Sequence, residues 1–327
     1  MRKNYLSVFL LSGVMIVSGQ AASIKSVEQL TAGGGYSSLS WAPDGAKFIA
    51  QNSAAGIMLY DFSGKNGKAL KPDETNLVKP SWSFDGNSIA AENLKDQSIM
   101  LFDLISGKAR TLEESNTYTK NLQPMTRVYG PCFAPDNDNI FFFYWRLNHG
   151  QTESYLMQYT LSAGGWDKIA EMIPDRRNYG NIAVSPKGGT LVFMRDLLKD
   201  VHTLYAVDTE TGKKKLLFEE LKGKTPVWSP DGKYIYTGAE LLNPAEKTCV
   251  KTCPESAGFS WSADGKKLFG AEKEKEGSLF IFDIESGKKQ DLPVSGFKVA
   301  GVSFTGDGKK AVCVDEKGGN LFLLTIE

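Results

Sequence analysis

One short motif recurs along the chain and constrains the fold more than any other feature. The motif occurs seven times, in four clear copies and in three weaker ones that surround Asp136, Lys187 and Asp307. Matching positions of successive copies are separated by 33 to 51 residues. Strand-forming repeats with a period near forty residues are typical of β-propeller blades. The four clearest copies place tryptophan, aspartate and glycine at matching positions: Trp41, Asp44 and Gly45; Trp82, Asp85 and Gly86; Trp228, Asp231 and Gly232; Trp261, Asp264 and Gly265.

Each copy predicts a four-stranded unit. The Pro-Asp-Gly type of turn joins two apolar strands, because proline fixes φ, aspartate bonds its own backbone and glycine accepts a positive φ. A third apolar run follows, as at 99–103, and a Ser-Gly-Lys turn at 106–108 leads to a short polar strand. We therefore predict an all-β, seven-bladed propeller over residues 22–327. Six or eight blades are the alternatives, because the fifth unit is only 33 residues long.

The two ends of the propeller are predicted to close on each other. The last unit finishes with its third strand at 321–326, and the segment 27–31 resembles a fourth strand. An N-terminal strand that completes the last blade would leave no open sheet edge. The tryptophans of the repeat occupy a position that is large or apolar in every copy, so we interpret them as packing between blades.

The first residues resemble an export signal. Arg2 and Lys3 precede an apolar run at 6–17, and the small residues Gly19 and Ala21 follow at the spacing of a cleavage site. This pattern predicts a signal peptide over residues 1–21 and a periplasmic or secreted protein. The run is shorter than the about 20 residues that a spanning helix needs, so we expect no stable membrane insertion. In an oxidising compartment, Cys249 and Cys253 could form a disulfide with a small loop.

The repeats, with their Trp-Ser-Pro-Asp-Gly-Lys pattern at 228–233 and an apolar strand that ends in Asp before Ser/Thr-Gly-Lys, resemble the WD40-like repeats of TolB-type propellers. Such propellers occur in the periplasmic Tol protein and in prolyl-oligopeptidase-like enzymes. The resemblance covers about residues 25–327 and implies the fold. It implies little about function, because these propellers serve many roles.

Composition excludes several classes of function. Lys plus Arg equals Asp plus Glu at 38 each, so a nucleic-acid partner is not expected. The chain has two histidines, His149 and His202, and no zinc signature, so we predict no metal and no cofactor. A serine-hydrolase elbow is missing its last glycine at 301–305, and no catalytic residue is assigned.

One constellation suggests binding. Arginine is rare, with seven in the chain, and five of the seven fall in the connections around the third and fourth units. Propeller topology places these connections on the face opposite the Pro-Asp-Gly turns. We call this set of residues the arginine patch: Arg127, Tyr129, Tyr144, Trp145, Arg146, His149, Arg176, Arg177, Tyr179 and Arg195. Arginine suits carboxylates, and aromatic faces suit sugars or aliphatic side chains. The alternative is that these arginines pair with local carboxylates such as Glu153, Asp175 and Asp196.

These observations predict a non-enzymatic, exported binding or scaffold protein. Its partner would be an envelope protein, a peptide segment or an acidic glycan. Two other functions stay open: an enzyme that acts on polysaccharide as a lyase or hydrolase, and a partner subunit of an envelope hydrolase or transporter.

Overall fold

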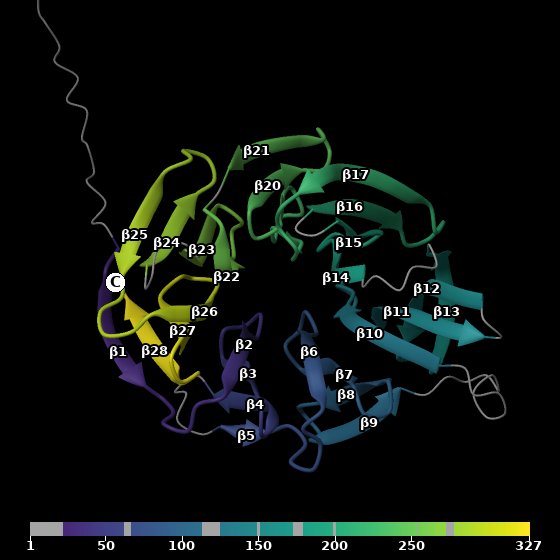
Figure 1. Ribbon diagram of the computed structural model, residues 1–327, viewed down its shortest axis with the longest axis horizontal. Coiled ribbons are helices and arrows are strands. Elements are labelled where there is room, and N and C mark those ends of the chain that lie inside the picture. Colours follow the sequence, from purple (N-terminus) through teal and green to yellow (C-terminus); the bar gives the residue numbers. More distant parts are fainter. Residues whose placement is uncertain are drawn as a thin grey trace, which may run out of the picture.

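The computed structural model describes residues 22–61, 67–112, 125–148, 151–172, 179–198, 201–252, 254–272 and 278–327. These residues form seven four-stranded antiparallel sheets, and none of them is helical. The sheets follow one another around a ring, with the first strand of each sheet innermost (Figure 1). The seven-bladed propeller predicted from the repeat is therefore confirmed, and six or eight blades are excluded.

The first three blades follow the repeat in order. Their strands are β2 (Tyr36–Trp41), β3 (Lys47–Asn52), β4 (Gly56–Asp61) and β5 (Lys68–Ala69); β6 (Leu77–Trp82), β7 (Ser88–Asn93), β8 (Ser98–Asp103) and β9 (Lys108–Leu112); and β10 (Met125–Phe133), β11 (Asn139–Asn148), β12 (Gln151–Thr160) and β13 (Gly165–Glu171).

The fourth to seventh blades continue the series. Their strands are β14 (Tyr179–Val184), β15 (Thr190–Leu198), β16 (Val201–Asp208) and β17 (Lys214–Leu221); β18 (Val227–Trp228), β19 (Ile235–Tyr236), β20 (Glu240–Asn243) and β21 (Thr248–Thr252); β22 (Ser256–Trp261), β23 (Lys267–Glu272), β24 (Ser278–Asp283) and β25 (Lys289–Pro293); and β26 (Val299–Phe304), β27 (Lys310–Asp315), β28 (Leu321–Ile326) and β1 (Ile24–Gln29).

The last blade is closed by the N-terminal strand. Strand β1 pairs antiparallel with β28, and Val27 lies opposite Leu324 in the register. The sheet order β1-β28-β27-β26 makes β1 the outermost strand of this blade, as the purple and yellow arrows of Figure 1 show. The predicted closure is confirmed.

The Pro-Asp-Gly turns all lie between the first and second strands of their blades, on what we call the turn face. In the second blade, Asp85 Oδ1 accepts hydrogen bonds from Ser83 Oγ at 2.6 Å and from Asn87 N at 3.0 Å. Gly86 has a φ of 70°, which glycine adopts without strain. The hydrogen bond from Ser83 is the main cause that lowers the pKa of Asp85. The turn is therefore held by the side chain of its own aspartate.

Repeat tryptophans reach across to the preceding blade. The indole of Trp41 donates to the Ser303 carbonyl at 2.9 Å, which joins the first blade to the seventh. The indole of Trp228 likewise donates to the Ala183 carbonyl at 3.1 Å. The buried hydrophobic clusters also lie mainly between neighbouring blades, so blade packing holds the ring together.

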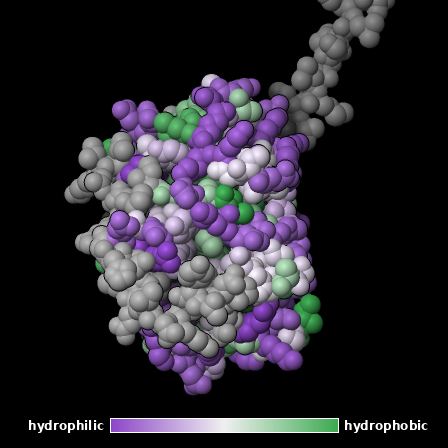
Figure 2. Space-filling view, turned by 90° about the vertical axis from the view of Figure 1, so that its right-hand side faces the viewer, coloured by the Kyte–Doolittle hydropathy of each residue, from purple (hydrophilic) through white to green (hydrophobic). Residues whose placement is uncertain are grey.

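Some predictions fall on residues outside the described ranges. Residues 1–21, predicted as a signal peptide, are among them, and so is Cys253, the predicted partner of Cys249. Within the described ranges, no helix is long and apolar enough to cross a membrane. Figure 2 shows the outer rim seen from the right of Figure 1, where hydrophilic residues dominate and hydrophobic ones are scattered.

Candidate functional site

The described residues of the arginine patch lie on the face opposite the turn face. This face, which we call the arginine face, carries the turns between second and third strands and the connections from one blade to the next. Arg127 lies near the start of β10, Arg146 near the end of β11, and Arg195 on β15 opposite Tyr179 in the register. The described patch residues thus gather on the third and fourth blades, whereas His149, Arg176 and Arg177 lie outside the described residues.

A buried carboxylate joins the second and third blades at this face. Glu92 near the end of β7 is fully buried, and its Oε1 accepts a hydrogen bond from Arg127 at 3.2 Å. Its Oε2 lies 3.6 Å from Lys79 Nζ. Both cations also stand over the ring of Tyr129, Arg127 at 5.2 Å and Lys79 at 5.7 Å from its centre. Two cations on one carboxylate leave one net positive charge.

These two cations are open to solvent. The Lys79 side chain is 45% exposed and the Arg127 side chain 39%, whereas the Glu92 side chain is 1% exposed. The carboxylate therefore fixes the cations from below, and their outer sides stay available. Strands β6 and β10, which carry them, are the innermost strands of their blades (Figure 1).

Lys79 has an unusual backbone. Its φ is 49°, in the left-handed region that glycine tolerates and lysine does not favour. The matching position of the third blade, three residues before the aromatic residue of the repeat, is Gly130 with a φ of 66°. A bulge interrupts the register of β6 and β7 between Val78 and Ser81. Backbone strain of this kind is concentrated at functional sites such as active sites and ligand-binding sites.

Arg146 forms a second ion pair on the third blade. Its Nε donates to Glu153 Oε2 at 2.7 Å, and the hydroxyl of Tyr155 donates to the same oxygen at 2.9 Å. Burial raises the pKa of Tyr155, and the hydrogen bond to Glu153 adds to the shift. Tyr144 stacks beside Tyr155 with ring centres 6.3 Å apart. Arg146 is thus engaged by a local carboxylate, one of the alternatives that the sequence left open.

Two hydrogen-bond donors lie buried between the third and fourth blades. Trp145 and Ser154 are opposite each other on β11 and β12. The indole Nε1 of Trp145 and the hydroxyl of Ser154 are closed to solvent and have no hydrogen-bond partner among the described residues. Trp145 packs against the cluster that contains Phe143 and Phe193. Arg195 lies two residues beyond Phe193 on β15.

Asp196 pairs with a histidine. Its Oδ1 is 2.7 Å from Nδ1 of His202 on the adjacent strand β16. His202 is 2% exposed, and its Nε2 has no hydrogen-bond partner in the described part of the chain. The carboxylate that the sequence offered as a partner for an arginine is therefore engaged by an imidazole.

Sequence reasoning missed Lys79, Glu92 and Ser154. Glu92 had a visible signal, since it is a charged residue inside an apolar strand at 88–93. Lys79 also had one, since the matching positions hold small residues such as Ser38, Gly130 and Gly258. Ser154 offers no comparable signal, because a serine near the start of a strand is common.

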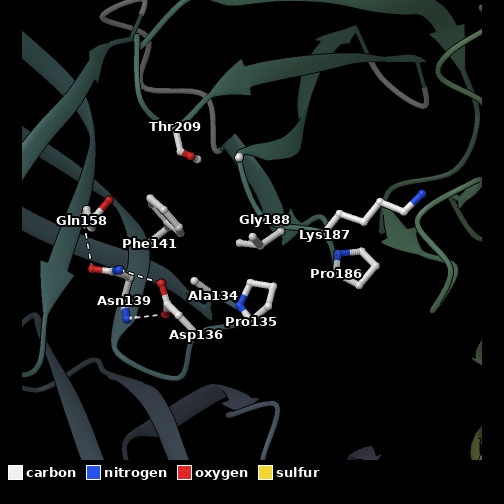
Figure 3. A pocket seen from close by; sticks show the side chains of 12 residues that line it. Ala134, Pro135, Asp136, Asn139, Phe141, Gln158, Pro186, Lys187, Gly188 and Thr209 are labelled. Atoms are coloured by element: carbon white, nitrogen blue, oxygen red, sulfur yellow. Dashed lines mark hydrogen bonds between the residues drawn. The ribbon is translucent and has the colours of Figure 1, made fainter.

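The turn face has a pocket of its own, of about 370 Å³, between the third and fourth blades. Figure 3 shows that three of its polar side chains bond to each other: Asn139 donates to Asp136, and Gln158 donates to Asn139. These three groups are therefore engaged in holding the blade turn together. Nowhere in the described ranges do three His, Cys, Asp or Glu side chains converge as they would around a metal ion.

The fold and this site define a seven-bladed β-propeller with a cationic face. No family model matches the chain. It is similar to the solved structure of an oligogalacturonate lyase in complex with manganese, with a TM-score of 0.67, 15% identity and 88% of each chain covered. It is also 27% identical over 203 residues to the uncharacterized peptidase YuxL of Bacillus subtilis (strain 168). That match covers 58% of this chain and 29% of the relative, so the chain spans about three tenths of it.

These comparisons contradict the expected non-enzymatic scaffold. Both similar proteins carry the names of enzymes, one a lyase and one a peptidase. The manganese of the solved lyase has no counterpart cluster among the residues described here, so no reaction step is assigned to a metal.

Proposed function

We propose that this protein is an exported enzyme that cleaves an acidic, uronate-containing polysaccharide by lyase chemistry, and that it is related to the TolB-type propellers. The observation that carries the proposal is the pair of half-exposed cations, Lys79 and Arg127, held by the buried carboxylate of Glu92. Its surplus positive charge suits a substrate carboxylate. The likeness in fold to an oligogalacturonate lyase supports the same substrate class.

The reaction explains why cations are needed. In a uronate, a base removes the proton from the carbon that bears the carboxylate. The glycosidic C–O bond on the neighbouring ring carbon then breaks, and a double bond forms between these two carbons. The departing oxygen takes up a proton. Negative charge accumulates on the carboxylate as the first proton leaves, and Lys79 and Arg127 would stabilise that charge. Tyr129 beneath both cations would hold them in place.

The experiment compares two identical substitutions. Lys79→Gly removes the lysine proposed to bind the substrate, at a position whose φ of 49° suits glycine. Lys247→Gly is the matched control, because it removes a lysine with a φ of 54° on the turn face, away from the proposed site. Polygalacturonate is the substrate, neutral galactan is the control, and the ultraviolet absorbance of the unsaturated product is followed. We expect cleavage of polygalacturonate by the wild type and by Lys247→Gly, and at least a tenfold loss in Lys79→Gly.

Other uronate polymers are then tried in the same assay. If the wild type forms no unsaturated product from any of them, the lyase proposal is wrong. Equal activity of the two variants would instead show that Lys79 does not bind the substrate.

The similarity to the peptidase YuxL favours a second candidate, a peptide-directed function. It predicts cleavage of fluorogenic peptides by the protein, or enhanced cleavage when a hydrolase partner is added. A protein that cleaves peptides and leaves polygalacturonate intact would support this candidate.

A further inference from the structure

We propose that the pocket of about 370 Å³ on the turn face, between the third and fourth blades, binds a primary ammonium group at the end of an aliphatic chain, as in a lysine side chain. This pocket lies on the face opposite Lys79 and Arg127. The site is therefore independent of the proposed lyase function.

The turn of the fourth blade differs from the other six turns in how it meets the blade before it. In the third blade, Asn137 replaces the turn glycine, and its Oδ1 accepts a hydrogen bond at 3.1 Å from the Asp85 amide of the second blade. At Gly188 of the fourth blade, an added β-carbon would have no described atom within 4 Å. The pocket lies in the space that this turn leaves open. In the remaining five blades, a β-carbon added to the turn glycine would lie within 4 Å of the preceding blade: Gly45, Gly86, Gly232, Gly265 and Gly308.

The fourth repeat departs from the repeat pattern at three positions that line the pocket. The first is Lys187, where the six other copies have aspartate, and the second is Gly189, where every other copy has a residue with a side chain. The Lys187 side chain extends away from Phe141 (Figure 3) and lies over Gly232 of the fifth blade. These two positions therefore place neither bulk nor an ammonium group in the pocket.

The third departure is Thr209, which directly follows strand β16. Its amide donates to the Gly189 carbonyl at 3.1 Å, as the amide of Leu104 in the second blade donates to Asn87 at 2.9 Å. Thr209 is smaller than the residues at this position in three other blades, so it leaves space beside Phe141 and brings a hydroxyl there (Figure 3). The larger residues are apolar and pack on or within the core clusters: Leu104, Leu161 and Ile284.

Two polar groups of the pocket are able to accept a hydrogen bond from a ligand. Gln158 donates through Nε2 to Asn139 at 2.7 Å and to Thr160 at 3.3 Å, but no described residue donates to its Oε1. The hydroxyl of Thr209 likewise has no hydrogen-bond partner in the described part of the chain. An ammonium group has three N–H donors and no acceptor, so it suits these oxygens, whereas a carboxylate does not.

Asp136 gives the pocket a negative charge. Burial raises the pKa of Asp136, but hydrogen bonds from Asn139 and Asp138 lower it further, so the carboxylate is ionised at neutral pH. Its Oδ1 accepts two backbone amides at 2.9 Å, and its Oδ2 accepts Asn139 Nδ2 at 2.7 Å. A carboxylate has about four lone-pair sites, so Oδ2 keeps one for a ligand. Because Lys187 points elsewhere, the charge of this lining favours a cation.

The rest of the lining is apolar. Methylene groups of a lysine side chain are stabilised by contact with such a surface, while the ammonium group stays among polar groups. An apolar wall beside a cluster of acceptors therefore selects an ammonium group that is carried by an aliphatic chain. The wall is formed by Ala134, Pro135, Phe141, Val184 and Pro186.

Calorimetry with small ligands tests the site. The protein is titrated with Nα-acetyl-lysine amide and with Nα-acetyl-norleucine amide, which keeps the carbon chain and lacks the ammonium group. We expect the lysine compound to bind at least about tenfold more tightly, because only its ammonium group reaches Asp136, Gln158 and Thr209. Butylamine separates two sources of the same group. Equal binding of butylamine assigns the site to free amines, and weaker binding assigns it to lysine in peptides.

A variant that closes the pocket gives the second readout. Thr209→Leu introduces the residue type that other blades tolerate at this position, and we expect it to weaken binding of the lysine compound at least about tenfold. The matched control is Glu210→Leu, which changes the next residue, an exposed one outside the pocket lining. We expect that control to bind as the wild type does.

The outcomes separate this site from the proposed lyase function. The ammonium site is wrong if the lysine and norleucine compounds bind equally, if neither binds, or if Thr209→Leu binds the lysine compound as tightly as the wild type does. Cleavage of polygalacturonate is measured on the same variant. We expect Thr209→Leu to cleave as the wild type does, because the cations proposed for that reaction lie on the arginine face.

Discussion

The two faces of the propeller come from the same repeat but use their polar side chains in opposite ways. On the turn face, the aspartates bond their own turns, as Asp85 bonds Ser83 and Asn87. On the arginine face, Glu92 is buried beneath two cations and donors of Trp145 and Ser154 have no acceptor among the described residues. The described turn-face aspartates are therefore used within their own turns, whereas the arginine face presents half-exposed cations to solvent.

The largest effect is expected from a deletion that disrupts the whole propeller and therefore both of its faces. Deletion of residues 22–32 takes away β1 and exposes the edge of β28 in the seventh blade. An open edge of a propeller invites pairing with other chains, so we expect unfolding or aggregation. Thermal melting and light scattering measure it. A melting temperature equal to that of the full chain would contradict the closure argument.

The second effect should be confined to the arginine face. Lys79→Ala combined with Arg127→Ala leaves Glu92 buried without a counter-charge, and we expect the free energy of unfolding to fall by about 3 kcal/mol. The control is Lys233→Ala with Lys247→Ala, two exposed lysines on the turn face, which should change it by less than about 0.5 kcal/mol. Urea unfolding measures both. Equal losses in the two double variants would show that Glu92 does not depend on its cations.

A smaller effect is expected on the turn face. Asp264→Ala removes the acceptor of the Ser262 hydroxyl at 2.6 Å and of the Lys266 amide at 3.0 Å. We expect a loss of about 1 kcal/mol in unfolding free energy, with galacturonate binding unchanged. Asp264→Asn keeps an acceptor oxygen and should lose less. Urea unfolding and calorimetry measure the two properties, and weakened binding in Asp264→Ala would contradict the separation of the faces.

The smallest effect per residue is expected from acid. The aspartates with a lowered pKa all lie in turn-face hairpins: Asp85, Asp103, Asp136, Asp208, Asp264 and Asp307. A lowered pKa in the folded state stabilises the fold above the unfolded value of about 3.9, and this stability is lost as the pH falls through the folded pKa. Urea unfolding at a series of pH values should show the decline below about pH 4, with a shallower slope in Asp264→Asn. An unchanged slope would mean that Asp264 does not take part.

Much of the fold could be predicted from the sequence because the repeat is local. Trp228, Pro230, Asp231 and Gly232 define a turn by their own backbone preferences, and the same turn recurs in each blade. The fifth blade was harder to predict, because its strands β18 and β19 have only two residues each. The site could be predicted in part: propeller topology brought Arg127, Trp145 and Arg195 to one face, but not their partners.

The sequence by itself determined the repeated turns, the strands beside them and the closing strand, because each depends on neighbours along the chain. It favoured seven blades by the count of repeats, and the structure then excluded six or eight. Only the tertiary structure decided what the polar side chains do. Glu92 meets Arg127 across 35 residues of sequence, and Trp145 meets the fourth blade only because Phe143 packs on Phe193. Such contacts depend on which strand face turns toward the next blade, and burial against that blade selects it.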